Sequence, residues 1–144
     1  MRASRLLAVL SFAFVVSSCG GTGGASGPTA LTRIDVTLSD TFAIEPGEMT
    51  VPAGTPVTFV ITNSGVIDHE FYLGDVAAQD AHEGEMAIMQ GWMHDHPEGI
   101  GLHPGETREL AYTFGSPGDF LAGCHLIGHY GAGMRAHVRV VPAG

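Results

Sequence analysis

Turn-forming residues recur about every ten positions from Ser39 onward, and this spacing limits the chain to short strands. Between the turns apolar side chains alternate with polar ones, as at Val57, Phe59 and Ile61. A period of two gives a sheet one apolar face, so the pattern favours an antiparallel sandwich or barrel. The turns are Ser39-Asp40, Pro46-Gly47, Pro52-Ala53-Gly54, Asn63-Ser64-Gly65, Pro104-Gly105 and Pro117-Gly118.

This pattern predicts one all-β domain over residues 30–144, with about seven to eight strands. Residues 75–104 interrupt the alternation and are expected to form a short helical or irregular insertion. About 115 residues is the size of a domain with a single modest core. The expected strands are Leu31–Leu38, Ala43–Val51, Pro56–Asn63, His69–Leu73, Thr107–Phe114, Gly118–Cys124 and Met134–Val141.

The N-terminal residues 1–18 have the composition of a secretory signal peptide, with basic residues, a short apolar run and small residues before a break. Val16-Ser17-Ser18-Cys19 resembles the bacterial lipobox, which implies cleavage before Cys19 and lipid attachment to its thiol. Residues 19–29 are rich in Gly, Ser, Thr and Ala and are expected to form a flexible tether. The alternative is an exported protein without a lipid, in which Cys19 is incidental.

The chain has two cysteines, Cys19 and Cys124, and an even number in an exported protein invites a disulfide. A bridge between them would compete with lipidation of Cys19 and with metal binding by Cys124. We therefore expect two separate roles, with the protein in the cell envelope or periplasm and in contact with a membrane only through the lipid anchor.

The formal net charge is −9, from 6 basic and 15 acidic residues. Removal of Arg2 and Arg5 with the signal peptide leaves 4 − 15 = −11, and there is no lysine. Such a surface repels nucleic acids and anionic lipid headgroups, whereas it attracts cations and basic proteins. A nucleic-acid-binding function is therefore disfavoured.

Residues 123–134 concentrate metal-binding side chains between glycines, with no acidic residue among them. Cys124, His129 and Met134 supply a thiol, an imidazole and a thioether at even spacing. A cysteine thiolate with two imidazoles and a weak axial methionine is the ligand set of blue copper sites. The stretch therefore needs one more histidine, and His69, at the start of an expected strand, is the best candidate.

With these residues in view, the chain resembles the cupredoxin family of small blue copper proteins, with a ligand spacing most similar to its rusticyanin-type members. The resemblance covers residues 30–144. It rests on Cys124-x4-His129-x4-Met134, on the stretch from Asn63 to Phe71, and on the stretch from Val51 to Val57.

The resemblance implies a cupredoxin-like Greek-key β-sandwich that holds one mononuclear type 1 copper. It makes Cys124 the thiolate ligand, His69 and His129 the imidazole ligands, and Met134 the weak axial ligand. Without copper the same residues would be a buried free cysteine, an exposed loop histidine and a core methionine, each of them ordinary.

Two residues depart from the family pattern. His125 after Cys124 also resembles the motif of multicopper oxidases, in which histidines on both sides of the cysteine reach a trinuclear cluster. Here Gly123 takes the other place, and we expect His125 to be a satisfied surface or strand-end histidine. Glu70 stands where many members have a small amide or hydroxyl that braces the ligand loop, so the reduction potential does not carry over.

The insertion contains a second set of soft ligands, which on a helix would form one stripe. One interpretation is that methionines cover the sandwich, with Trp92 packed among them; the other is a second copper site for Cu(I). Gly84 and Gly91 weaken a continuous helix. The candidate ligands of the second site are His82, Met86, Met89, Met93, His94 and His96.

The residues favour a monomeric one-electron carrier that docks briefly, through the surroundings of His129, on a redox partner protein with a basic surface. The alternative is a copper-binding protein for copper tolerance, storage or delivery. An enzyme is the third possibility, and the sequence lacks an evident acid/base pair for it. His137 alternates with Ala136 and Val138 and is expected to face solvent.

Overall fold

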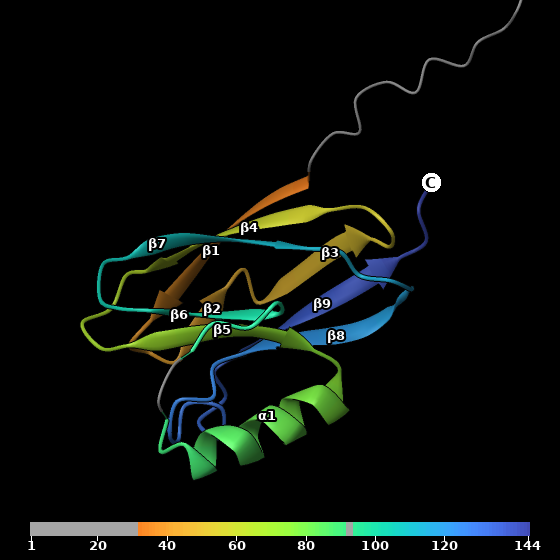
Figure 1. Cartoon of the computed structure of the whole chain (residues 1–144). Coiled ribbons are helices and arrows are strands. Elements are labelled where there is room, and N and C mark those ends of the chain that lie inside the picture. The colour runs from red at the N-terminus through yellow and green to blue at the C-terminus, as the bar shows by residue number, and fades with distance from the viewer. Residues whose placement is uncertain (1–31, 92–93) are drawn as a thin grey trace, which may run out of the picture.

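The computed structural model describes residues 32–91 and 94–144. Two β-sheets face each other, and one helix lies beside the second sheet (Figure 1). The predicted signal peptide, the tether, Cys19, Trp92 and Met93 lie outside the described residues. The predicted β-sandwich is confirmed.

Nine strands form the two sheets within the described residues. The first sheet has the order β2-β1-β4-β7 and the second the order β3-β9-β8-β5-β6. The strands are β1 Thr32–Ser39, β2 Ala43–Glu45, β3 Glu48–Pro52, β4 Val57–Asn63, β5 His69–Gly74, β6 Gly99–Leu102, β7 Thr107–Tyr112, β8 Gly118–Gly123 and β9 Arg135–Val141.

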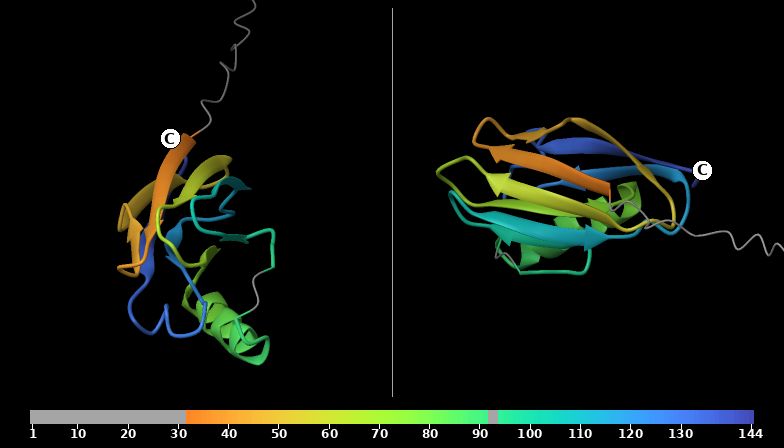
Figure 2. Two further views of the ribbon diagram at one scale, coloured as in Figure 1. Left: turned by 90° about the vertical axis from the view of Figure 1, so that its left-hand side faces the viewer. Right: turned by 90° about the horizontal axis from the view of Figure 1, so that it is seen from above.

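Both sheets are mixed, whereas the sequence pattern favoured an antiparallel sandwich or barrel. β1 pairs with β4 in parallel, and β3 pairs with β9 in parallel, while the other pairs are antiparallel. The chain crosses between the sheets after β2, β3, β4, β6 and β7, as the right-hand view of Figure 2 helps to follow. Such crossings bring strands that are far apart in sequence next to each other.

The strands differ from the prediction in two places. The segment Ala43–Val51 is two strands, because the chain leaves the first sheet at Pro46-Gly47 and enters the second. β6 was not predicted, since a four-residue strand with two glycines has little apolar alternation. It pairs with β5 as the edge of the second sheet, with Phe71 opposite Ile100.

The core lies between the sheets and is filled by the alternating apolar side chains. Phe59 of β4 and Phe71 of β5 are fully buried, with ring centroids 5.4 Å apart, and they join the two sheets. On β9 the exposed and buried positions alternate, and His137 faces solvent as predicted.

The insertion contains the helix α1, Val76–Ile88, followed by a loop that leads to β6. Asp75 caps the helix, since its side chain accepts a 2.9 Å hydrogen bond from the backbone N–H of Ala78. The helix ends where Gln90 and Gly91 adopt positive φ angles of 57° and 74°. Gly91 thus lies just beyond the end of the helix, whereas Gly84 lies inside it despite its low helix propensity.

The buried face of α1 is largely polar, consisting of Gln79, His82 and Met86. The side-chain amide of Gln79 donates to the carbonyls of Tyr72 and Leu121, at 3.2 and 3.0 Å. The helix therefore attaches to β5 and β8 through directional hydrogen bonds more than through apolar packing. No helix in residues 32–91 and 94–144 has the length and apolar character that crossing a bilayer requires.

The core contact between the sheets predicts the effect of one truncation. Phe59→Ala should lower the free energy of unfolding by about 3–5 kcal/mol, because it leaves a cavity between two rigid sheets. Chemical denaturation measures the change. Thr58→Ala, on the same strand with its side chain on the opposite face, should cost about 1 kcal/mol or less; an equal cost for both would contradict the assigned core.

Candidate metal centre

Three side chains from separate parts of the chain meet at one end of the sandwich. His69, Cys124 and His129 each offer one donor atom, and these atoms lie within 4.8 Å of one another. Sγ of Cys124 is 3.3 Å from Nδ1 of His129. His69 and Cys124 are fully buried, and His129 is half-buried.

Strand pairing explains this convergence. β5 and β8 are antiparallel neighbours, with Tyr72 opposite Gly123, so His69 at the start of β5 lies beside the end of β8. Cys124 follows directly after β8. His69 and Cys124 are therefore brought together by the sheet, although they are 55 positions apart in the sequence, and His129 comes from the loop that follows β8.

The loop between β8 and β9 is held at both ends by backbone hydrogen bonds. The N–H of Cys124 donates to the carbonyl of Met134, and the N–H of Met134 donates to the carbonyl of His129, both at 3.1 Å. Met134 is completely buried beside this cluster in the core. A loop held at both ends in this way keeps its metal-binding side chains in one geometry.

The side chains fit a soft metal ion. Nδ1 of His69 is buried without a hydrogen-bond partner, which leaves its lone pair available to a metal. Burial raises the pKa of the Cys124 thiol to about 12, so the thiolate needs a cation to form. A buried thiolate, two imidazoles and a nearby thioether are the donors that select copper.

Asp40 orients His69. From the sequence it was expected only to form a turn with Ser39. Its Oδ1 lies 3.1 Å from Nε2 of His69, and its Oδ2 accepts a 2.8 Å hydrogen bond from the N–H of Val66. That backbone hydrogen bond is the main cause that lowers the pKa of Asp40. A carboxylate on the far nitrogen of a ligating histidine fixes its orientation and raises its basicity. Gly65 leaves room for Asp40, because a Cβ there would collide with the carboxylate.

Glu70 braces the ligand loop despite its departure from the family pattern. Its side chain is 1% exposed, and Oε2 accepts a 3.0 Å hydrogen bond from the N–H of His125. Its own backbone N–H donates to Sγ of Cys124 at 3.3 Å. Glu70 therefore contacts the thiolate through its backbone and the loop through its carboxylate.

His125 is a satisfied histidine, as expected, but it is buried and not at the surface. Its Nε2 lies 2.6 Å from Oε1 of Gln79, and its Nδ1 lies 2.7 Å from Oε2 of Glu83. Both ring nitrogens are engaged, so His125 has no atom free for a metal. Its neighbour Gly123 admits no side chain, since a Cβ would lie 2.5 Å from that Gln79 oxygen. The histidine after Cys124, which resembles the multicopper oxidase motif, thus contacts α1 and has no ring nitrogen left for a metal.

The residues proposed from the sequence for a second site are only partly assembled. His82 and His96 come together, and Glu85, which sequence analysis did not include, joins them. The ring of His94 packs on His96, with centroids 4.1 Å apart. Met86 is buried, Met89 is at the surface, and Met93 lies outside the described residues.

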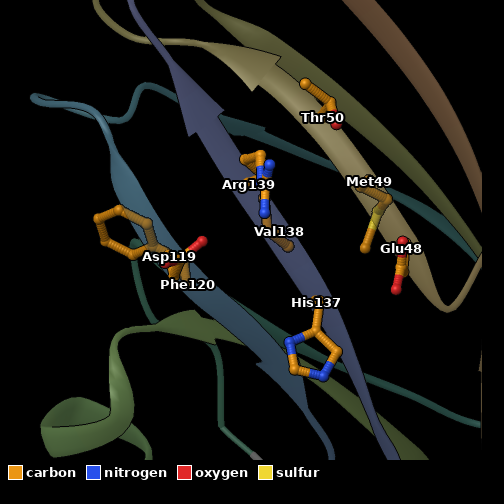
Figure 3. Close-up of a pocket in the computed structure, with 8 residues that line it drawn as sticks. All are labelled: Glu48, Met49, Thr50, Asp119, Phe120, His137, Val138 and Arg139. Carbon is orange, nitrogen blue, oxygen red and sulfur yellow. The ribbon is translucent and has the colours of Figure 1, made fainter.

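A shallow depression lies elsewhere on the second sheet, lined mainly by the exposed residues of β3, β8 and β9 (Figure 3). His137 and Arg139 project into it from β9, with Asp119 and Glu48 on either side. None of the four sequence-predicted copper ligands lines it.

Comparison with known proteins identifies similar copper proteins, although no family model matches the chain. The chain is 37% identical over 107 residues to the copper-resistant cuproprotein CopI of Rubrivivax gelatinosus, covering 74% of this chain and 65% of that protein. It is 33% identical over 138 residues to CopI of Pseudomonas aeruginosa, covering 76% of each. The chain thus spans slightly less than two thirds of the Rubrivivax protein and about three quarters of the Pseudomonas protein.

Solved structures show which fold the sandwich has. The chain superposes on the reduced auracyanin of Roseiflexus castenholzii with a TM-score of 0.69 and 22% identity, covering 77% of this chain and 98% of that one. An azurin of Methylomonas sp. strain J gives a TM-score of 0.62 at 16% identity, covering 76% and 98%. The sandwich therefore has the cupredoxin fold, as predicted from the sequence.

Replacing the thiolate ligand tests the site. Cys124→Ser should abolish the intense visible charge-transfer band that appears when Cu(II) is added to the protein, because that band requires copper–thiolate bonding. Absorption spectroscopy measures it. His137→Gln, on the exposed face of β9, should keep the full band; an undiminished band in Cys124→Ser would refute the site.

Removing the carboxylate behind His69 tests how that ligand is oriented. Asp40→Ala should weaken copper binding about 10- to 100-fold, the usual cost of losing a partner that orients a ligand. Competition with a copper chelator measures the affinity. Asp35→Ala removes an exposed carboxylate paired with Arg33 and should leave the affinity unchanged; equal affinities of both variants would show that Asp40 has no such role.

Proposed function

Because the chain belongs to the family of copper-resistant cuproproteins CopI, we propose that it binds one copper ion in its cupredoxin domain and acts in copper resistance. The observation that carries this proposal is the convergence of His69, Cys124 and His129, whose donor atoms lie within 4.8 Å of one another. The names of the relatives support the resistance role, since all three are called copper-resistant cuproproteins.

The chain's residues divide the work of binding. Cys124 and the two histidines would hold the ion, and the buried Met134 would offer a thioether as a further, weaker donor. Copper bound there supplies one-electron exchange between Cu(II) and Cu(I). Asp40 keeps the Nδ1 of His69 directed to the site, while the N–H of Glu70 moderates the negative charge on the thiolate. Burial of Cys124 keeps water and oxidants from the sulfur.

We further propose that the protein is exported to the cell envelope and held there by a lipid on Cys19. The composition of residues 1–18 and the sequence Val16-Ser17-Ser18-Cys19 support this. A binding protein in this compartment would meet copper before it enters the cytoplasm. The role is that of a binding protein and not of an enzyme.

Electron transfer is a second candidate function, supported by the surface around His129. Ile127, in the ligand loop, is 70% exposed, and Val66, in the loop next to Asp40, is 82% exposed. Apolar residues around a half-buried ligand permit brief contact with a redox protein. The net charge of −9 would steer a partner with a basic surface.

A growth assay tests the resistance role. Expression of the protein in a copper-sensitive bacterium should raise the copper concentration that stops growth, because a bound ion is unavailable for damage. Cys124→Ser should lose this protection, whereas His137→Gln should retain it. Equal protection by wild type and Cys124→Ser would overturn the proposal.

A surface variant separates the two functions. Ile127→Asp should leave the visible band and the growth protection unchanged, because the side chain is exposed and binds no metal. If the protein also carries electrons, the same variant should slow its oxidation by a redox protein in stopped-flow measurements. Val76→Asp, at the N-terminal end of α1, provides the exposed control. Equal rates for both variants would count against docking at Ile127.

A further inference from the structure

A second group of metal-binding side chains lies within the insertion, between α1 and the loop that leads to β6. His82 and Glu85 come from α1, and His96 comes from the loop. One donor atom from each lies within 4.8 Å of the others. His82 and Glu85 are three residues apart and therefore share one face of the helix.

Two nitrogen atoms in this group are buried without hydrogen bonds. They are Nδ1 of His82 and Nε2 of His96. Buried polar atoms in folded proteins are almost always paired, so two unpaired nitrogens in one place indicate a missing ligand. The nearest carboxylate oxygen, Oε2 of Glu85, lies 3.5 Å from Nδ1 of His82, too far for a good hydrogen bond.

The two histidines are held in position by other contacts. Nε2 of His82 lies 3.0 Å from Oε1 of Glu70, and the ring of His82 stacks on Tyr72 with centroids 3.9 Å apart. The backbone of His96 pairs with Gly99 through hydrogen bonds of 2.7 and 3.2 Å. A carboxylate on the far nitrogen of a histidine is the usual companion of metal ligation.

We propose that Nδ1 of His82, Nε2 of His96 and the carboxylate of Glu85 bind a second, divalent metal ion. Two imidazoles and a carboxylate are borderline and hard donors that suit a divalent transition metal, and affinity among such ions peaks at Cu(II) and is lower for Zn(II). Glu85 is half-exposed, so its side chain can rotate to shorten the distances to those of a metal site. Its three members are two histidines and a glutamate, whereas the site proposed from the sequence combined histidines with methionines.

Glu70 connects this site to the first one. Its Oε1 contacts His82, while its Oε2 accepts from the N–H of His125 and its backbone N–H donates to Cys124. A metal ion on His82 would draw electron density from Glu70 and shorten its bond to that ring. The inference does not depend on whether the copper at Cys124 serves resistance or electron transfer.

Calorimetry with Zn(II) tests the second site on protein that already holds one copper. Wild type should bind one equivalent of Zn(II). Glu85→Gln and His96→Gln should each weaken this binding at least about tenfold, whereas His137→Gln should bind normally. In a parallel titration, Cu(II) as the second ion should add a new electron paramagnetic resonance signal that His96→Gln lacks.

The visible band of the first copper shows that each variant is folded, because within residues 32–91 and 94–144 Glu85 and His96 belong to a different group from His69, Cys124 and His129. No uptake of Zn(II) by wild type, or equal uptake by wild type, Glu85→Gln and His96→Gln, would overturn the second site. Loss of the visible band in wild type would instead refute the first site, so the two failures are distinguishable.

Discussion

The buried carboxylate of Glu70 is the interaction on which the rest of the site depends. Burying a carboxylate is unfavourable unless both oxygens find partners. Oε2 accepts from the N–H of His125, and Oε1 lies 3.0 Å from Nε2 of His82. In this arrangement Glu70 of β5 contacts both the ligand loop and α1, while its backbone N–H donates to the sulfur of Cys124.

The same polar network makes the insertion part of the metal centre. Gln79 joins α1 to β5 and β8 through backbone carbonyls, and its oxygen contacts the ring of His125 next to Cys124. Directional hydrogen bonds fix a helix in position more closely than apolar contacts do, because each has a preferred distance and angle. The sequence favoured a helix that merely covers the sandwich. In the structure α1 instead supports the ligand loop through its hydrogen bonds to His125.

Local sequence patterns predicted most of the sandwich, and three of the four residues proposed as copper ligands, His69, Cys124 and His129, come together in the structure. Alternating residues mark β4 and β9, since strand periodicity is a local property. β6 was not predicted, because it forms through pairing with β5 and its own residues show little strand periodicity. The role of Asp40 was not predicted, because it contacts His69 from 29 positions away in the sequence. Glu85 could have been predicted, because it lies three residues after His82 on the same helix.

By itself the sequence determined the kinds of ligand, their order and the strands that carry them, because spacing and periodicity are properties of neighbouring residues. Only the tertiary structure decided that His69 lies beside Cys124, that Asp40 directs it, and that His125 faces α1. It also decided that His82 and His96 meet at Glu85. These contacts depend on which strands are neighbours in each sheet, and burial then selects the partners that satisfy every polar atom.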